Sequence, residues 1–121
     1  MTEQHPHVEI HRKEGFTEAI FLDREIIHEP TTQRLREELT DLLTANPGIR
    51  LLLNFDRVER LSSLALGMLI IVLKRVLSQH GQLKLCNLCP KVHEELGLTK
   101  LHRVFDIYDN PEQAVADFAG P

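Results

Sequence analysis

Two short segments near the start of the chain have the pattern of β-strands. Residues 8–12 alternate apolar and polar side chains, and residues 16–22 form a second candidate strand. The turn between them, residues 13–15, is short, so the two strands are predicted to form a hairpin. Residues 23–29 match no pattern clearly.

The rest of the chain alternates between helical periodicity and short apolar runs. Leucines recur at helical spacing between a helix entry at residues 30–32 and a stop at residues 46–48. Residues 49–55 are almost all apolar, as in a strand that is covered on both faces. The remaining pattern predicts helices over residues 62–79, over residues 90–96 before Gly97, and from residue 111, with strands over residues 82–87 and 104–108.

In this order the segments predict an α/β fold with four helices. Strands that alternate with helices form a mainly parallel sheet, to which the opening hairpin adds an antiparallel strand. The length suits one domain over residues 1–121, with residues 1–7 and 119–121 frayed. Sites in such folds lie at the carboxyl ends of the parallel strands, which draws attention to residues 56–63.

Composition narrows the classes of function. The hydrophobic fraction of 42% and the charged fraction of 26% are typical of a soluble globular protein. A net charge of −4, the absence of Trp and the lack of a basic run argue against a nucleic-acid partner. The N-terminus has no signal-peptide core, and residues 64–73 are too short an apolar stretch to insert into a membrane. With only two cysteines, the chain is expected in the cytoplasm.

A pair of serines, Ser62 and Ser63, stands where a buried strand gives way to a helix. Serine is a preferred N-cap residue, so one reading is that either serine only caps the helix. A hydroxyl at this point is also a candidate for phosphorylation, because a helix N-terminus favours negative charge. The two roles are compatible, since the two serines can divide them.

The helix that follows these serines is apolar around most of its circumference. Only a narrow polar stripe remains, which carries Gly67, Lys74 and Ser78. A helix on one face of a sheet needs about 100° of apolar surface, so this helix has more than it needs. The excess is expected either to contact another protein or to be buried by neighbouring helices.

Cys86 and Cys89 form a C-x-x-C motif at a strand-to-helix junction. Such a pair can be a thiol redox centre, because a helix N-terminus lowers the pKa of a thiol. The alternative is ordinary packing of small apolar side chains. A zinc site has weak support because no fourth ligand is evident, and no nucleotide-binding motif occurs, so no metal and no cofactor are expected.

The segment of residues 51–77, an apolar strand followed by Ser-Ser-Leu-Ala-Leu-Gly and an apolar helix, resembles the STAS family. The Gly-Gln-Leu strand at residues 81–83 and the spacing of Val92, Leu96 and Leu101 match the family in the same order. The resemblance covers nearly the whole chain and implies a STAS-like fold. It also implies an anti-sigma factor antagonist (anti-anti-sigma factor) that binds an anti-sigma factor or serine kinase and is switched by phosphorylation of one serine.

Alignment of Leu66 and Gly67 with the family motif puts the phosphate acceptor on Ser63, with Ser62 as second choice. The family's Asp before the acceptor is Ser62 here, and a family Gly is Ala65. The partner surface implied by the resemblance comprises Asn54, Asp56, Arg57, Ser62, Ser63, Leu64, Gly67 and Met68.

Three hypotheses for function therefore stand. The first is the switched, non-enzymatic regulatory module, for which a homodimer is also compatible. The second is an unswitched STAS subunit of a stress-signalling or lipid-transport complex, which the departures from the motif favour. The third is a thiol oxidoreductase that uses Cys86 and Cys89.

Overall fold

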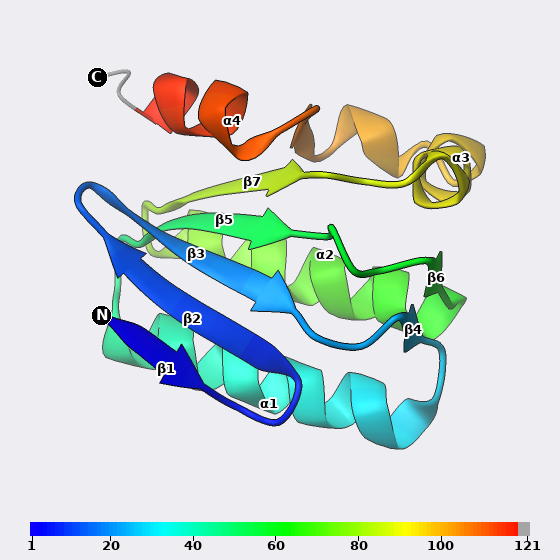
Figure 1. Ribbon diagram of the computed structural model, residues 1–121, viewed down its shortest axis with the longest axis horizontal. Coiled ribbons are helices and arrows are strands. Elements are labelled where there is room, and N and C mark those ends of the chain that lie inside the picture. Colours follow the sequence, from blue (N-terminus) through cyan, green and yellow to red (C-terminus); the bar gives the residue numbers. More distant parts are fainter. Residues whose placement is uncertain (119–121) are drawn as a thin grey trace.

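A six-stranded mixed sheet forms the centre of the computed structural model, which describes residues 1–118 (Figure 1). The strand order is β1-β2-β3-β5-β7-β8, in which the first three strands pair antiparallel and the rest pair parallel. A separate pair, β4 and β6, is parallel. The strands are β1 (Thr2–Gln4), β2 (Val8–Lys13), β3 (Phe16–Phe21), β4 (Glu25–Ile26), β5 (Arg50–Asn54), β6 (Arg60–Leu61), β7 (Gln82–Cys86) and β8 (Asp106–Tyr108).

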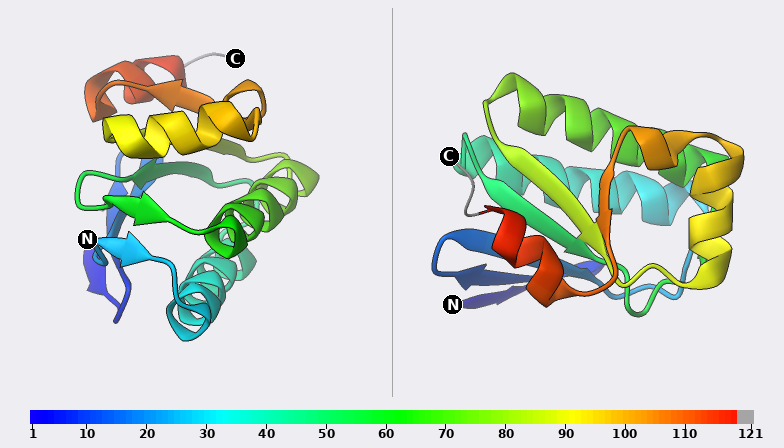
Figure 2. Two further views of the ribbon diagram at one scale, coloured as in Figure 1. Left: turned by 90° about the vertical axis from the view of Figure 1, so that its right-hand side faces the viewer. Right: turned by 90° about the horizontal axis from the view of Figure 1, so that it is seen from above.

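Helices cover both faces of the sheet. One face carries α1 and α2, and α4 lies on the other (Figure 2). The helix α3 lies at the end of the sheet where the parallel strands finish (Figure 1). The helices are α1 (Glu29–Ala45), α2 (Ser63–Ser78), α3 (Pro90–Leu98) and α4 (Pro111–Phe118), with a 3-10 turn η1 (Leu101–Arg103). None of the helices within residues 1–118 is long and apolar enough to cross a bilayer.

The strand β5 lies at the centre of the hydrophobic core. Leu51 and Leu53 point into the large core under α1 and α2, and Leu52 points into a smaller cluster with Ala114 and Phe118 of α4. All three leucines are fully buried because both faces of the strand are covered. This confirms the prediction made from the unbroken apolar run.

The predicted fold class is confirmed, and four details of the prediction are wrong. The helix α3 continues through Gly97 and ends one residue later at Leu98. The last strand begins only at Asp106, because η1 and a turn precede it. The small β4–β6 pair was not predicted at all.

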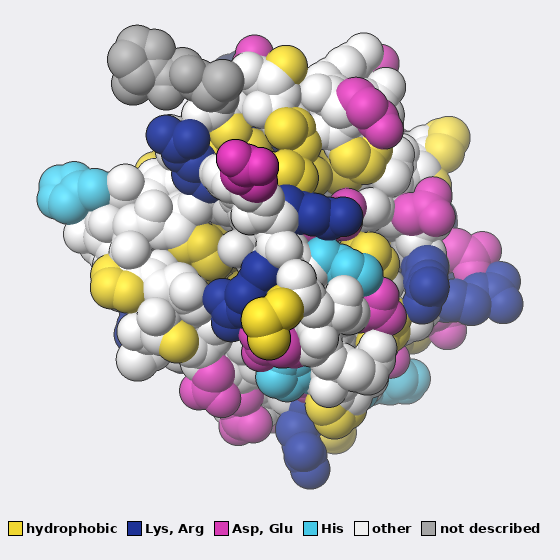
Figure 3. Space-filling view, turned by 60° about the vertical axis from the view of Figure 1, so that its left-hand side comes forward, with side chains coloured by type: hydrophobic (Ala, Val, Ile, Leu, Met, Phe, Trp, Pro, Cys, Tyr) yellow, Lys and Arg dark blue, Asp and Glu magenta, His cyan; other side chains and the backbone are white. Residues whose placement is uncertain are grey.

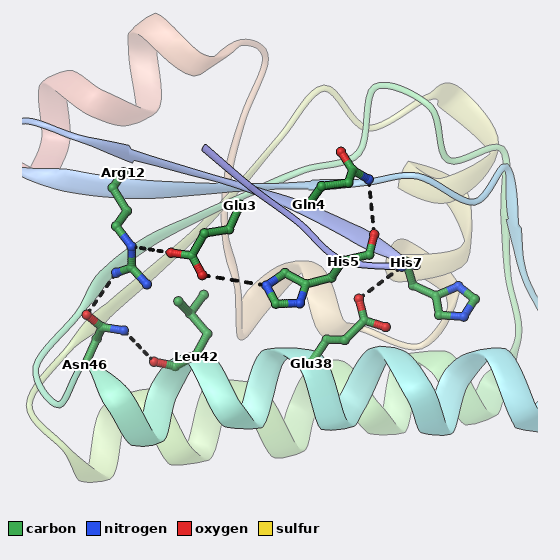
Figure 4. Close-up of polar contacts among 8 residues, drawn as sticks. All are labelled: Glu3, Gln4, His5, His7, Arg12, Glu38, Leu42 and Asn46. Atoms are coloured by element: carbon green, nitrogen blue, oxygen red, sulfur yellow. Dashed lines mark hydrogen bonds and ion pairs between the residues drawn. The ribbon is translucent and has the colours of Figure 1, made fainter. Parts of the chain in front are cut away.

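The fourth wrong detail is the N-terminus, which was predicted to be frayed but forms β1 on the edge of the sheet. Side chains tie this strand to α1 (Figure 4). The Arg12 guanidinium donates to Glu3 at 2.6 Å and to the Asn46 side chain at 3.1 Å. The His7 amide donates to the Glu38 carboxylate at 3.0 Å. These long-range contacts order the segment. The other predicted frayed end, residues 119–121, lies outside the described residues.

Candidate functional site

The segment between β5 and α2 is held in place by the connection between β3 and α1. Its short strand β6 pairs with β4, and the Glu59 and Arg60 amides both donate to the Arg24 carbonyl. The Ser62 amide then donates to the Ile26 carbonyl at 3.1 Å. These bonds bring the start of α2 beside the start of α1, at the end of the sheet where the parallel strands finish (Figure 1).

The two serines have different environments. Ser62 is the N-cap of α2, with extended backbone, and its hydroxyl oxygen accepts a hydrogen bond from the Ala65 amide at 3.1 Å. Ser63 is the first residue of the helix and is exposed. Its hydroxyl makes no hydrogen bond with any other residue in the range 1–118. Ser62 therefore stabilises the helix terminus, and the Ser63 hydroxyl is accessible from solution.

The apolar surface of α2 is only partly covered. Leu64 is 51% exposed, Ile71 is 44% exposed and Leu77 is 57% exposed. The helix contains no acidic residue. Of the two alternatives for the excess apolar side chains, burial by neighbouring helices does not hold for these three, and an apolar surface remains exposed next to Ser63.

A groove of about 270 Å³ runs between the first halves of α1 and α2. A Cβ atom added at Gly67 would meet no atom within 4 Å, so this glycine leaves the groove open. Met68 is 4% exposed and contributes to the wall of the groove. The residues that line the groove are Glu29, Thr32, Gln33, Arg36, Ser63, Leu64, Gly67, Met68 and Ile71.

Asn54 does not lie on this surface, in contrast to its place in the predicted partner-binding set. It is 7% exposed, and its amide nitrogen donates to the Glu18 carboxylate at 3.1 Å. Its side-chain oxygen accepts from the Asp56 amide at 2.9 Å and from the Asn87 side chain at 3.1 Å. Asn54 therefore fixes the turn after β5, and Asp56 and the adjoining Arg57 are exposed.

Two ion pairs join the neighbouring strands β4 and β6, and sequence reasoning did not predict them. Arg24 pairs with Glu59, and Arg60 pairs with Glu25 at 3.2 Å. The hydrogen bond from Arg24 lowers the pKa of Glu59. Because the partners lie 35 residues apart, no local pattern could indicate them. The four side chains line a cleft of about 790 Å³ together with Cys89, Pro90 and Lys91 at the start of α3.

The buried thiol of the cysteine pair, Cys86, lacks the environment of a redox thiol. Burial raises the pKa of the Cys86 thiol to about 12, and the carboxylates of Glu18, Glu112 and Asp56 act in the same direction. A redox thiol needs the opposite environment, in which the thiolate is stabilised. Both cysteines are free, and no metal-binding group of three His, Cys, Asp or Glu side chains occurs among the described residues.

Charge is mixed on one face of the molecule. Figure 3 shows one face, on which Lys and Arg side chains are interspersed with Asp, Glu and hydrophobic side chains. The described part of that face carries no continuous basic area of the kind that binds a phosphate backbone.

The mixed sheet with two helices on one face is a fold shared with solved anti-sigma factor antagonists. An anti-sigma factor antagonist (STAS) domain protein from Planctomyces limnophilus superposes with a TM-score of 0.82 at 18% identity, over 93% of this chain and 97% of that one. For an anti-sigma factor antagonist from Mycobacterium paratuberculosis the TM-score is 0.81 at 18% identity, over 93% of each chain. The phosphorylated form of SpoIIAA, a Bacillus cell fate determinant, gives 0.68 at 14% identity, over 91% of this chain and 96% of that one.

The family is established independently of these superpositions. The STAS domain family model matches residues 7–114, and the chain therefore belongs to the STAS domain family. No curated protein matches the sequence. The solved structures are distant in sequence, so they show the shared fold and nothing finer.

Proposed function

We propose that this chain is a non-enzymatic regulatory module of the bacterial cytoplasm that binds an anti-sigma factor with serine kinase activity. The first half of α2 is the binding surface, and Ser63 is the phosphate acceptor. The observation that carries the proposal is an accessible hydroxyl at Ser63 beside the exposed apolar side chain of Leu64.

Phosphorylation of Ser63 would switch binding through charge. A phosphoserine carries about −1.5 to −2 charges at neutral pH. A partner that packs on Leu64 and Ile71 would have to remove water from these phosphate charges, which costs binding free energy. The same charge is favourable for the free protein, because it stands at the N-terminus of a helix. The modification would therefore weaken the complex without unfolding the domain. The solved phosphorylated form of SpoIIAA supports a modified state of this fold.

The departures from the family motif are compatible with the switch. Ser62 replaces the family's Asp, yet it keeps the capping hydrogen bond that such a residue supplies. Ala65, at a glycine position of the family, is fully buried against the core and lies away from the groove lining. An unswitched STAS subunit is the second candidate, since the family's Asp and Gly are replaced by Ser62 and Ala65.

The experiment pairs the purified chain with the serine kinase anti-sigma factor encoded in the same genome and measures affinity by calorimetry. Ser63→Asp is expected to weaken binding by about tenfold or more, the equivalent of ~1.4 kcal/mol. Ser78→Asp is the matched control, because Ser78 is an exposed serine at the other end of α2. Leu64→Ala should also weaken binding, whereas Leu77→Ala should not, although both side chains are about half exposed.

Two results would contradict different parts of the proposal. Equal affinity of the parent and Ser63→Asp proteins would refute the switch and favour the unswitched subunit. Absence of binding by every form would refute the proposal that this kinase is the partner. Incubation of the complex with ATP, followed by mass spectrometry of the phosphopeptide, identifies the acceptor.

A further inference from the structure

Ser63 shares its groove with an arginine of the neighbouring helix. Arg36 of α1 and Ser63 of α2 both line the 270 Å³ groove. The strands β3, β5 and β7 are parallel, so the connecting helices α1 and α2 run in the same direction and start at the same end. Arg36 lies two turns into α1, and side chains on a helix lean toward its N-terminus. From this position the Arg36 side chain can extend along the groove toward the end where Ser63 stands.

Arg36 is exposed and has no ion pair or hydrogen bond with any other residue in the range 1–118. The neighbouring Gln33 is engaged differently, since its amide donates to Glu37 at 3.3 Å. A guanidinium has five donors that match the oxygens of a phosphate. Arg36 is thus available for a charge that appears inside the groove.

The other charged groups along the two helices decide how strong such a contact can be. Glu29, in the first turn of α1, lines the same groove and would oppose a phosphate. Arg36 also lines a second hollow between the helices, together with Glu37 and Asp41 of α1 and Arg75 of α2. The helix α2 adds no acid of its own. Among the described residues that line the groove with Ser63, Arg36 is the one cation.

We infer that Arg36 is the internal counter-charge for a phosphate on Ser63 and holds it in the groove between α1 and α2. This inference rests on the proposed modification of Ser63. A phosphate held there lies over Gly67 and beside Leu64, in the space that a side chain of the partner would otherwise enter. The modification then acts by filling the groove, and α2 keeps its shape.

The test measures the second ionisation of the phosphate by phosphorus NMR, in protein that carries phosphoserine at position 63 through genetic incorporation. For a cation held on the order of 5 Å from the phosphate in water, removal of the cation should raise the pKa of the phosphate by about 0.5. Arg36→Gln is expected to give this rise. Arg34→Gln is the control, because Arg34 is exposed on the same helix and does not line the groove. Glu29→Gln should shift the pKa in the opposite direction.

The inference is overturned if Arg36→Gln and Arg34→Gln move the phosphate pKa equally, or if neither moves it. Circular dichroism of each variant checks that the fold is intact, and both arginines are exposed, so neither substitution removes buried structure. Because the phosphoserine is incorporated genetically and no partner is present, this result is independent of partner binding. If no binding to the proposed partner is found, the NMR result is unaffected. If the phosphate pKa does not change, the proposal about the partner is unaffected.

Discussion

The glycine in the candidate groove allows stability and binding to be separated. Gly67 is the fifth residue of α2, and replacement by alanine adds a single methyl group. The added carbon meets no atom within 4 Å, so the substitution causes no clash within the domain. The same carbon projects into the space between α1 and α2 that a partner is proposed to enter.

The expected gain in stability follows from helix propensity. Glycine inside a helix costs about 1 kcal/mol relative to alanine, mainly because the unfolded glycine chain has more freedom to lose. Gly67→Ala should therefore raise the free energy of unfolding by about 1 kcal/mol and the melting temperature by roughly 4 °C. Gly97→Ala is the matched control, since Gly97 also lies in a helix with open space around it. Its gain should be about 0.5 kcal/mol, because it lies in the last turn of its helix.

Urea unfolding followed by circular dichroism measures both gains, and calorimetry with the kinase partner measures affinity. Gly67→Ala is expected to weaken the complex at least about threefold, the equivalent of ~0.7 kcal/mol, and Gly97→Ala to leave it unchanged. A loss of stability in Gly67→Ala would show that the groove is closed in solution and would refute the reasoning. Equal affinity of the two variants would show that the partner does not enter the groove.

Three further predictions concern the fold around the site. Gly81→Ala should lower the free energy of unfolding by about 3 kcal/mol in urea titrations, because the new carbon would lie 2.5 Å from the Ile49 carbonyl oxygen; an unchanged midpoint contradicts this. Ser62→Ala should cost about 1 kcal/mol in the same assay through loss of the helix cap, and no loss would show that the cap is dispensable. In native protein at pH 8, iodoacetamide should modify Cys89 long before Cys86, whose raised pKa keeps its thiol protonated, and mass spectrometry with equal labelling of both would refute the burial argument.

Local pattern was sufficient for most of the elements. The alternation in residues 8–12, the apolar run of β5 and the helical spacing of the leucines in α1 each predicted the element that forms. These signals succeed because a strand or helix facing one core repeats its buried positions at a fixed period. The serine pair was also placed correctly at the start of α2, because a helix cap is a local feature of the sequence.

Contacts between distant residues were outside the reach of local pattern. The order of β1 depends on Arg12 reaching Asn46, 34 residues away, and the β4–β6 pair depends on partners 35 residues apart. From the sequence, Asn54 was expected at the surface at the end of a strand. In the structure it is buried, and hydrogen bonds with Glu18 and Asn87 satisfy its side chain there. The two members of each pair are too far apart in the sequence for a local pattern to contain both.

The sequence by itself determined the order of strands and helices, the family and the position of two serines at a helix start. Only the tertiary structure decided which side of α2 stays open. A helix that is apolar around most of its circumference does not fully specify its own orientation, because several of its sides could be buried equally well. The packing of α1 against α2 buries Met68, leaves Leu64 and Ile71 exposed, and brings Arg36 into the same groove as Ser63.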